Sequence, residues 1–502
     1  MKVDYNLYIR VTDLTAMLKE AKHKIRGLEK TAVELAAKIS EVTASNLKLT
    51  VKNAELVASN TALSAKLDLL QIRRTSKNSS KPPSSDFPPP EKTKSGENRN
   101  LTNGKRGGQP GHPGLCRAYL VADKVEHAIP TSCINCGTPL EGRDKHPSRV
   151  QQIEIPKMSA IVTDFYCHEL RCSQCGTKTK AESSEAAIFG TFGPRLTSFI
   201  GLLSGKFHLS KRFIQEVLHD AFGVQLALGT VSNLEQQLSR SLAEPVQEAR
   251  ASIQQRQVIH VDETGWREDK HGAWMWVASC PEVAVFCISR SRGKKVAKNL
   301  IGETFSGIAV SDRWRSYLWL PTEHHQICWA HLKRDFQLWV DVGRGDAVYG
   351  KRMLAHVETI FKWWHQFILK KIDRDELNHH MKSTIVGTIS DLHEAKNCAN
   401  KRISGMAREI LTLEKSLWHF LTRENVSPTN NFAERVIRTA VIWRKICFGT
   451  DSELGSRFAE RLLTVAVTLR LQHRNVLEYL TTAYRAFLTG MSVPSLLPAK
   501  PA

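Results

Sequence analysis

Long apolar runs are missing from the 502-residue sequence, and acidic residues are in short supply. No uninterrupted apolar stretch approaches the roughly 18 residues that a membrane-spanning helix needs, so the sequence predicts no membrane span. The N-terminal stretch MKVDYNLYIR lacks the apolar centre of a signal peptide. Eleven cysteines are too few for a disulfide-dense scaffold of this length, and four of them have metal-type spacing. These absences predict a protein of a reducing compartment.

The charge balance is strongly basic. The chain has 71 Lys and Arg residues against 50 Asp and Glu residues, a net charge of +21. Such a balance favours a polyanionic partner, nucleic acid before others, and a basic surface that serves solubility alone is the alternative. Hydrophobic residues at 41% and charged residues at 24% are typical of soluble globular proteins. The length predicts roughly three domains. We expect a cytoplasmic protein with access to DNA.

Residues 1–72 have the repeat of a coiled coil. With Leu18 at position a, the heptad register runs unbroken over eight heptads, with Leu, Val or Ala at every d position. The a positions also carry Asn46, Asn53 and Asn60, and a paired Asn at a fixes register at a cost in stability. The pattern predicts a homodimer or a higher oligomer through a parallel coiled coil. A long helix packed against its own chain is the alternative.

Residues 73–118 change composition abruptly and are rich in Pro, Ser and Gly. Between Arg73 and Arg117 there are ten basic residues and three acidic ones. A segment of this kind cannot bury enough apolar surface to order itself. We predict a basic disordered linker, and the same segment is also a candidate arm that orders on DNA.

Two matching cysteine turns follow, in residues 119–186. The spacing is Cys-x-x-Cys-Gly, once at 133–137 and again at 172–176. Two such turns bring four thiolates into a tetrahedral site, and a site closed by four protein ligands is structural. We therefore predict a zinc-binding domain with one structural Zn²⁺, held by Cys133, Cys136, Cys172 and Cys175. Cys167 and His168 are rival ligands, and a strand-rich insert is expected at 153–155 and 161–163.

Residues 187–250 read as helices separated by a turn that contains Gly223. The second helix is expected to begin with Thr230 or Ser232 as its cap. Helix, turn and a polar-fronted helix make the helix-turn-helix arrangement, although ordinary helical hairpins share it. The candidate DNA contacts are Thr230, Ser232 and Asn233.

Residues 251–338 read as the first part of a catalytic core. Strands are predicted at 258–262, 273–278, 283–289, 307–312 and 326–329, which suggests a mixed sheet of the ribonuclease H type. Asp262 and Asp312 each end a buried strand, where a hydrated cation can reach a carboxylate. Mg²⁺ takes oxygen ligands and suits converging carboxylates. The neighbouring Glu263 points to the opposite side of its strand and is predicted to tolerate Gln.

A third carboxylate comes from residues 426–490, which complete the core after a helical insertion at 339–425. Here Asn430, Glu434 and Arg438 share a helical face by their spacing. Amide and guanidinium donors beside a carboxylate fit a metal ligand next to phosphate-binding groups, and a solvated Glu–Arg pair is the alternative. Candidate DNA contacts are Asn430, Arg435 and Arg438, with Arg444 and Lys445 as further phosphate clamps. Ala459-Glu460-Arg461 repeats Ala433-Glu434-Arg435, but Asn430 and Asn431 precede only Glu434. Residues 491–502 form a tail.

These motifs together resemble the insertion-sequence 66 family of bacterial transposases. The resemblance is carried by the segments His260-Val-Asp-Glu-Thr-Gly-Trp266, Ser311-Asp312, Cys328-Trp-Ala-His331, Asn430-Asn-x-Ala-Glu-Arg435 and Phe448-Gly-Thr-Asp451. The coiled coil, the NSSKPPSSD and GGQPGH segments and the zinc module agree with it. The chain departs from the family pattern at Arg313-Trp314, where a smaller residue is expected.

The resemblance implies a multidomain α+β protein: an N-terminal coiled coil, a zinc-binding module, a helical DNA-binding region and a ribonuclease H-like core with a helical insertion. It implies a DDE transposase that cuts insertion-sequence ends and joins them to target DNA, with an acidic triad of Asp262, Asp312 and Glu434. Two Mg²⁺ or Mn²⁺ ions would be held by that triad, since paired cations serve both reacting oxygens. Its partners would be double-stranded DNA and accessory proteins encoded by the same element, in a bacterial cytoplasm at the nucleoid. A metal-dependent nuclease and a non-enzymatic DNA-binding regulator are the rival interpretations.

Overall fold

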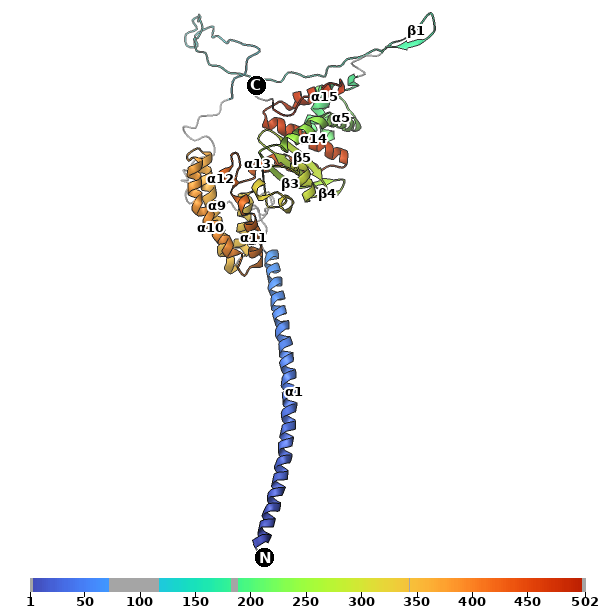
Figure 1. Ribbon diagram of the computed structural model, residues 1–502. Coiled ribbons are helices and arrows are strands. Elements are labelled where there is room, and N and C mark those ends of the chain that lie inside the picture. Colours follow the sequence, from blue (N-terminus) through green and yellow to red (C-terminus); the bar gives the residue numbers. More distant parts are fainter. Residues whose placement is uncertain (1–2, 72–116, 182–187, 343, 499–502) are drawn as a thin grey trace. The chain divides into compact units, whose positions relative to one another are not determined.

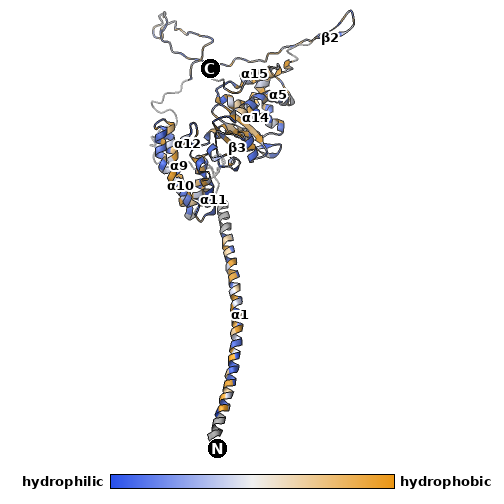
Figure 2. Cartoon of the chain, in the orientation of Figure 1, coloured by the Kyte–Doolittle hydropathy of each residue, from blue (hydrophilic) through white to orange (hydrophobic). Residues whose placement is uncertain are grey.

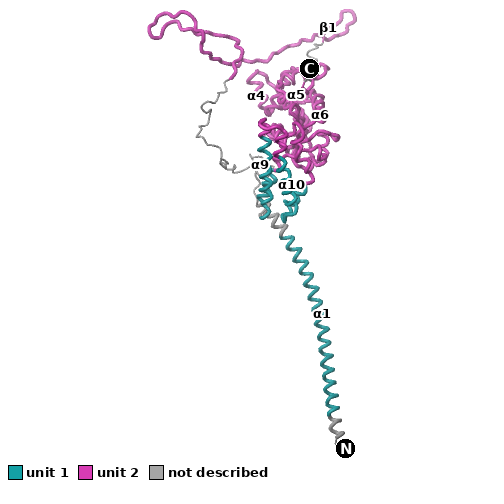
Figure 3. Tube along the Cα trace, turned by 60° about the vertical axis from the view of Figure 1, so that its left-hand side comes forward, with its two compact units in different colours: residues 1–86, 333–365, 381–409 teal, residues 87–332, 366–380, 410–502 magenta. Residues whose placement is uncertain are grey.

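The computed structural model describes residues 3–71, 117–181, 188–342 and 344–498 (Figure 1). The fold is mixed α and β, as the sequence predicts. The chain separates into two compact units, coloured in Figure 3: residues 1–86, 333–365 and 381–409 form one, and the remaining residues form the other. The predicted basic linker lies outside the described residues, apart from its last two positions. Among the described residues no helix is long and apolar enough to cross a membrane.

The N-terminal segment is one continuous helix, α1 (Val3–Gln71). Hydrophobic residues recur along it (Figure 2), and the large ones whose exposure is described are open to solvent; Leu28, for example, is 70% exposed. The helix agrees with the prediction for this region. The pairing of two such helices stays a prediction.

Residues 117–181 carry little regular structure. The described pairings are a short hairpin of β1 (Glu169–Arg171) and β2 (Lys178–Lys180), and an isolated bridge between Ser132 and Pro139. The strand-rich insert expected at 153–155 and 161–163 is not formed, and Ile161 is 96% exposed. That expectation was wrong because these apolar residues have no packed layer to alternate against.

Four helices follow: α3 (Pro194–Gly205), α4 (Lys211–Phe222), α5 (Leu228–Ser241) and α6 (Ala243–Ile253). Ser210 caps α4, and Gly223 ends it in the left-handed conformation. The predicted cap of α5 was wrong, because α5 begins at Leu228 after Ala227. Thr230 and Ser232 therefore lie inside the helix, and the Ser232 hydroxyl donates to the Leu228 carbonyl oxygen at 3.3 Å.

A five-stranded mixed sheet forms the centre of the second unit, in the order β5-β4-β3-β6-β7. Neighbours β5, β4 and β3 are antiparallel, whereas β3, β6 and β7 are parallel. A two-residue turn with Asp269 and Lys270 at positive φ joins β3 to β4. The strands are β3 (Val258–Glu268), β4 (His271–Ser279), β5 (Ala284–Ser289), β6 (Ile308–Ser311) and β7 (His325–Ile327).

One prediction about these strands needs correction. Asp262 was expected to end its strand, but β3 runs on to Glu268 because its second half stays paired with β4. Asp312 does follow the end of β6 at Ser311. Asp262 therefore lies where the parallel partner β6 ends, in the middle of its own strand.

Helices of the C-terminal region pack against the sheet and against α3 and α5. The buried core joins Met275 and Val277 of the sheet to Leu462 and Leu480 of these helices. These helices are α13 (Asn431–Cys447), α14 (Glu453–Leu471) and α15 (Val476–Leu488), and a further helix, α7 (Lys294–Ile301), connects β5 to β6. The region predicted as a helical insertion is helical. It contains α9 (Ala347–Ile368), α10 (Arg374–Ala395), α11 (Lys401–Thr412) and α12 (His419–Thr422), preceded by α8 (Trp329–Val342).

Helix α14 protects the open edge of the sheet with three polar side chains spaced four residues apart. The hydroxyls of Thr464 and Thr468 accept from the N–H groups of Phe286 and Ala284, both at 3.0 Å. Glu460 accepts from the next outward N–H of β5, that of Ile288. An uncovered strand edge is a template for pairing with another chain, and this ladder occupies it. Glu460 is thus a buried structural residue, unlike Glu434, whose sequence pattern it repeats.

Glu460 makes the stability of the protein depend on pH. Burial raises the pKa of its carboxyl from 4.5 to about 7. The folded state holds the carboxyl proton of Glu460 more tightly than the unfolded chain does. The stability that the protonated carboxyl contributes is therefore complete below about pH 4.5 and is lost as pH rises toward 7 and beyond. We predict that Glu460→Gln, which keeps an oxygen acceptor for Ile288, removes a pH dependence of up to about 3 kcal/mol. Urea unfolding of both proteins between about pH 5 and pH 7.5 measures it.

The wild-type protein should lose stability relative to Glu460→Gln across that range. Equal slopes for the two proteins would show that Glu460 does not titrate there. The exposed Glu303, changed in the same way, is the control, and its slope should match the wild type.

Candidate active site

Asp262 and Asp312 come together through the register of the two central parallel strands. His260 of β3 is paired with Val310 of β6, so the residues two positions further along each strand are the two aspartates. Asp262 Oδ1 accepts from the N–H of Glu263 at 2.9 Å. Asp312 Oδ1 accepts from the N–H of Trp314 at 3.0 Å, which fixes the turn after β6.

Glu434 reaches the same region from the first turn of α13. Its side chain is 37% exposed, and one carboxylate oxygen lies 3.8 Å from Nδ1 of His331, near the start of α8. A carboxylate in the first turn also interacts favourably with the helix dipole. His331 is a site residue that sequence reasoning missed, although its Cys-Trp-x-His segment was among the motifs.

The charges of Asp312 and Glu434 both act on the carboxyl of Asp262. The pKa of Asp262 lies well above its usual value, first because of burial and then because of the charges of Glu263, Asp312 and Glu434. Within the described residues, no group of three or more His, Cys, Asp or Glu side chains is arranged so that it could hold a metal ion. What the cluster offers is repulsion between carboxylates in a partly desolvated place, which raises the free energy of their charged forms.

Asn430 fastens the helix of Glu434 to the strand of Asp262. Its side chain is fully buried; Nδ2 donates to the carbonyl oxygen of Val261 at 2.7 Å, and Oδ1 lies 3.2 Å from Nδ1 of His260. Its backbone N–H donates to Cys328 Sγ at 3.1 Å. The predicted DNA contact of Asn430 is therefore wrong, because all of its side chain faces the protein interior. It positions Glu434 instead.

Glu263 belongs to a second buried network beside the aspartates. Arg292 donates to Glu263 Oε1 from Nη2 at 2.7 Å and from Nε at 3.0 Å, and the Tyr317 hydroxyl donates to Oε2. Removing one partner from such a network leaves a buried charge uncompensated. The tolerance of Glu263 to Gln that the strand alternation predicted is therefore no longer expected.

The same arginine explains how the chain accommodates Trp314. The Arg292 guanidinium lies 3.8 Å from the centre of the Trp314 ring and 4.2 Å from that of Trp274, so two rings enclose it. The Trp314 indole N–H donates to the Arg292 carbonyl oxygen at 3.3 Å. The large residue thus packs within the protein and braces the turn that carries Asp312. No sequence signal separates Arg292 from the other basic residues around it.

The predicted DNA contacts differ in how accessible they are. Arg435 and Arg438 are exposed on α13, and Asn233 is exposed on α5. Arg444 is held internally, because it donates to the Gly265 carbonyl oxygen and to the Thr264 hydroxyl. Ser232 accepts from Lys211 Nζ at 2.6 Å. The exposed positions among them are therefore Arg435 and Arg438 on α13 and Asn233 on α5.

The two cysteine turns have the same local geometry. In each, the N–H of the glycine donates to the carbonyl oxygen of the first cysteine at 2.9 Å, with Gly137 at φ 74° and Gly176 at φ 70°. Hydrogen bonds from Thr138 and Thr177 lower the pKa of Cys136 and Cys175 to about 7, which favours the thiolates that Zn²⁺ binds. The structure forms both turns but does not bring the four sulfurs together.

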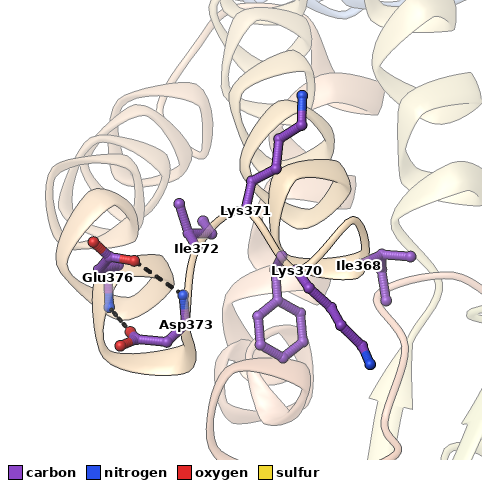
Figure 4. Close-up of a pocket in the computed structure, with 7 residues that line it drawn as sticks. Ile368, Lys370, Lys371, Ile372, Asp373 and Glu376 are labelled. Atoms are coloured by element: carbon purple, nitrogen blue, oxygen red, sulfur yellow. Dashed lines mark hydrogen bonds between the residues drawn. The ribbon is translucent and has the colours of Figure 1, made fainter.

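A surface pocket lies elsewhere, at the connection between α9 and α10 (Figure 4). There Asp373 and Glu376 form a reciprocal capping box: each side chain accepts from the backbone N–H of the other, at 2.8 and 3.0 Å. Two lysines and apolar side chains complete the lining. These carboxylates serve the helix end, so the pocket offers no reactive group.

Comparison with known proteins first defines a class. The model of the family described as "Transposase IS66 family" matches residues 190–457, which include the sheet and all three carboxylates. The chain is therefore a DNA-processing enzyme of the transposase class. Because the match covers more than half of its length, the chain belongs to the IS66 family of transposases, as its motifs predicted.

Two further matches are to proteins whose descriptions give no function. A family of unknown function (DUF6444) matches residues 11–118, the region of α1 and the basic segment. The uncharacterized protein y4qI of Sinorhizobium fredii (strain NBRC 101917 / NGR234) is 23% identical over 414 residues, 75% of each chain. That similarity extends beyond the region matched by the transposase family.

The neighbouring residues Asn430 and Asn431 give a matched test of the helix anchor. Asn430→Ala leaves the Val261 carbonyl and the His260 ring without their buried partner, and we predict a loss of about 2 kcal/mol in the free energy of unfolding. The exposed Asn431, changed to Ala, should alter it by no more than about 0.5 kcal/mol. Urea denaturation measures both values. Similar losses for the two variants would contradict the anchoring role.

Proposed function

We propose that the protein is a DDE transposase that cuts DNA at insertion-sequence ends and joins the ends to target DNA. Asp262, Asp312 and Glu434 are the proposed catalytic residues, on a core of the ribonuclease H type. The observation that carries the proposal is the strand register that sets Asp262 beside Asp312, with Glu434 on the helix that Asn430 bonds to β3. The strand order, with two antiparallel neighbour pairs followed by two parallel ones, supports the proposed core.

The residues present fit divalent cations by their chemistry. Three carboxylates would hold Mg²⁺ or Mn²⁺, two ions per site, and the bound pair supplies an activated oxygen nucleophile and a stabilised leaving oxygen. Asp262 and Asp312 contribute from adjacent strands, and Glu434 closes the set from its helix. No covalent intermediate between protein and DNA is required, so no nucleophilic Ser or Tyr is assigned.

DNA is proposed to approach along the exposed face of α13. Arg435 and Arg438 lie there, one and four residues after Glu434, and would contact phosphates next to the reacting bond. The helical region from α3 to α5, with Thr230 and Asn233, is a second proposed contact. Such contacts make affinity depend strongly on salt concentration.

The two rival functions are separable by experiment. A nuclease without strand transfer would cut element ends but not join them to a target. A non-enzymatic regulator would bind DNA and give no metal-dependent cleavage. The presence of all three carboxylates in one region favours the transposase over the regulator.

The catalytic proposal predicts that Asp262→Asn, Asp312→Asn and Glu434→Gln each lower cleavage and joining about a thousandfold while DNA binding stays near wild type. Each change removes a hard oxygen ligand, whereas affinity rests on Lys and Arg elsewhere. Strand transfer with Mg²⁺ or Mn²⁺ measures activity. Mn²⁺ should also raise the melting temperature of the wild type but not of Asp262→Asn, which is a readout independent of turnover.

The exposed Glu303, changed to Gln, is the control and should keep full activity and the Mn²⁺ response. An active Glu434→Gln protein would refute the triad. Glu460 is unsuitable as a control, because its loss would expose the edge of β5.

We further propose that the two cysteine turns close around one structural Zn²⁺, within a zinc-binding domain over residues 119–186. The module would then fold only with the metal. Elemental analysis should find one Zn²⁺ per chain and none after Cys172→Ser. Full zinc content in that variant would make Cys167 or His168 the ligand.

The assembly is proposed to be a dimer or higher oligomer through α1. The exposed apolar stripe, with Leu28 and Leu35 among its members, supports it. Light scattering on the isolated segment 14–70 should give a dimer, and a monomer at micromolar concentration would contradict the proposal. Accessory proteins encoded by the same element are proposed as further partners, and the bacterial nucleoid is the proposed place of action.

A further inference from the structure

Phe448 is an aromatic residue in an unfavourable backbone conformation with its side chain in solvent. It follows the last residue of α13 with φ at 61°, the left-handed region that glycine normally occupies at a helix end. Its side chain is 71% exposed, so burial does not offset the conformational cost. Strained residues of this kind are found where a protein holds a group ready for a ligand.

The surrounding backbone keeps Phe448 in this place. The N–H of Phe448 donates to the Arg444 carbonyl oxygen at 2.8 Å, and the N–H of Thr450 donates to that of Arg267 at 3.0 Å. Gly449 between them must be glycine, because a Cβ there would collide with the Arg267 carbonyl oxygen. The side chain therefore projects from a rigid junction between α13 and the hairpin of β3 and β4.

Phe448 lies at the end of a basic face that begins at the candidate active site. The exposed positions of α13 are three or four residues apart and form one stripe: Asn431, Arg435, Arg438, Ile442 and Lys445. Beside the stripe, Ile446 is 55% exposed. The cations suit a phosphate backbone, whereas the core of a protein–protein interface is depleted in charge.

We propose that Phe448, with Ile446 beside it, is a wedge that contacts the bases of DNA lying along α13. This rests on the proposed DNA-processing function. Phe448 follows Glu434 by 14 residues in the sequence, or about 21 Å along the helix, the length of about six base steps. Apolar side chains on such surfaces enter between base pairs and unstack them, and aromatic rings stack on exposed bases.

The sharpest test uses the backbone strain. Phe448→Gly removes the ring and relieves the positive φ, so the variant should melt at a higher temperature than the wild type but bind DNA about tenfold more weakly. A purely structural role cannot move the two quantities in opposite directions. The probe is a 30-base-pair duplex with 2-aminopurine at intervals, whose fluorescence rises when a base is unstacked. Full-length wild type should raise it, and Phe448→Gly should not.

His473 provides the matched control, because it is also an exposed non-glycine residue in the left-handed region, with φ at 56°. His473→Gly should raise the melting temperature and leave affinity and fluorescence unchanged. Phe448→Trp should keep wild-type affinity.

Wild-type affinity for Phe448→Gly, with unchanged fluorescence, would overturn the wedge while leaving the proposed function intact. A change in oligomeric state in that variant would overturn it in favour of docking by a second copy of the chain. Failure of the wild type to bind the duplex would overturn both the wedge and the proposed function.

Discussion

The buried side chain of Asn430 sets the relation between the two elements that carry the candidate active site. Helix α13 and strand β3 are distant in sequence, and nothing in their separate folding fixes where Glu434 lies relative to Asp262. Hydrogen bonds of Asn430 to Val261 and toward His260, on the two residues before Asp262, fix that position. An asparagine at a helix start usually caps its own helix. Here it leaves that role unfilled and joins two elements instead.

A second buried network, built on Arg292, supports the other side of the two aspartates. Arg292 joins the buried Glu263 to the turn after Asp312 and is enclosed by two tryptophan rings. The aspartates are thus supported by a network that is itself satisfied, which is what a site under electrostatic repulsion requires. On the far edge of the sheet, α14 covers β5 with Glu460 and two threonines.

The sequence allowed the mixed sheet, the helical insertion and the family to be predicted, because strand alternation and paired motifs are local signals. The end of β3 was misjudged, since the pairing of its second half with β4 depends on a hairpin turn at Asp269 and Lys270 whose strength is not visible in apolar spacing. Asn430 was assigned to DNA for a related reason. Its spacing placed it on one helical face with Glu434 and Arg438, and only the three-dimensional contact with β3 shows that it is buried. The predicted roles of the carboxylates and cysteines stay predictions.

Strand β3 and helix α13 are held together near both ends of the helix, and Arg444 in its last turn also bonds to Thr264 and Gly265 of the strand. Asn430 joins them at one end, and the hydrogen bonds of Thr450 with Arg267 and Asp269 join them at the other. Hydrogen bonds at both ends keep the helix from rotating relative to the strand. If DNA lies along α13 as proposed, the spacing between the bond that is cut and the base contacted by Phe448 is therefore a fixed measure built into the protein, and the DNA rather than the enzyme has to bend to meet it.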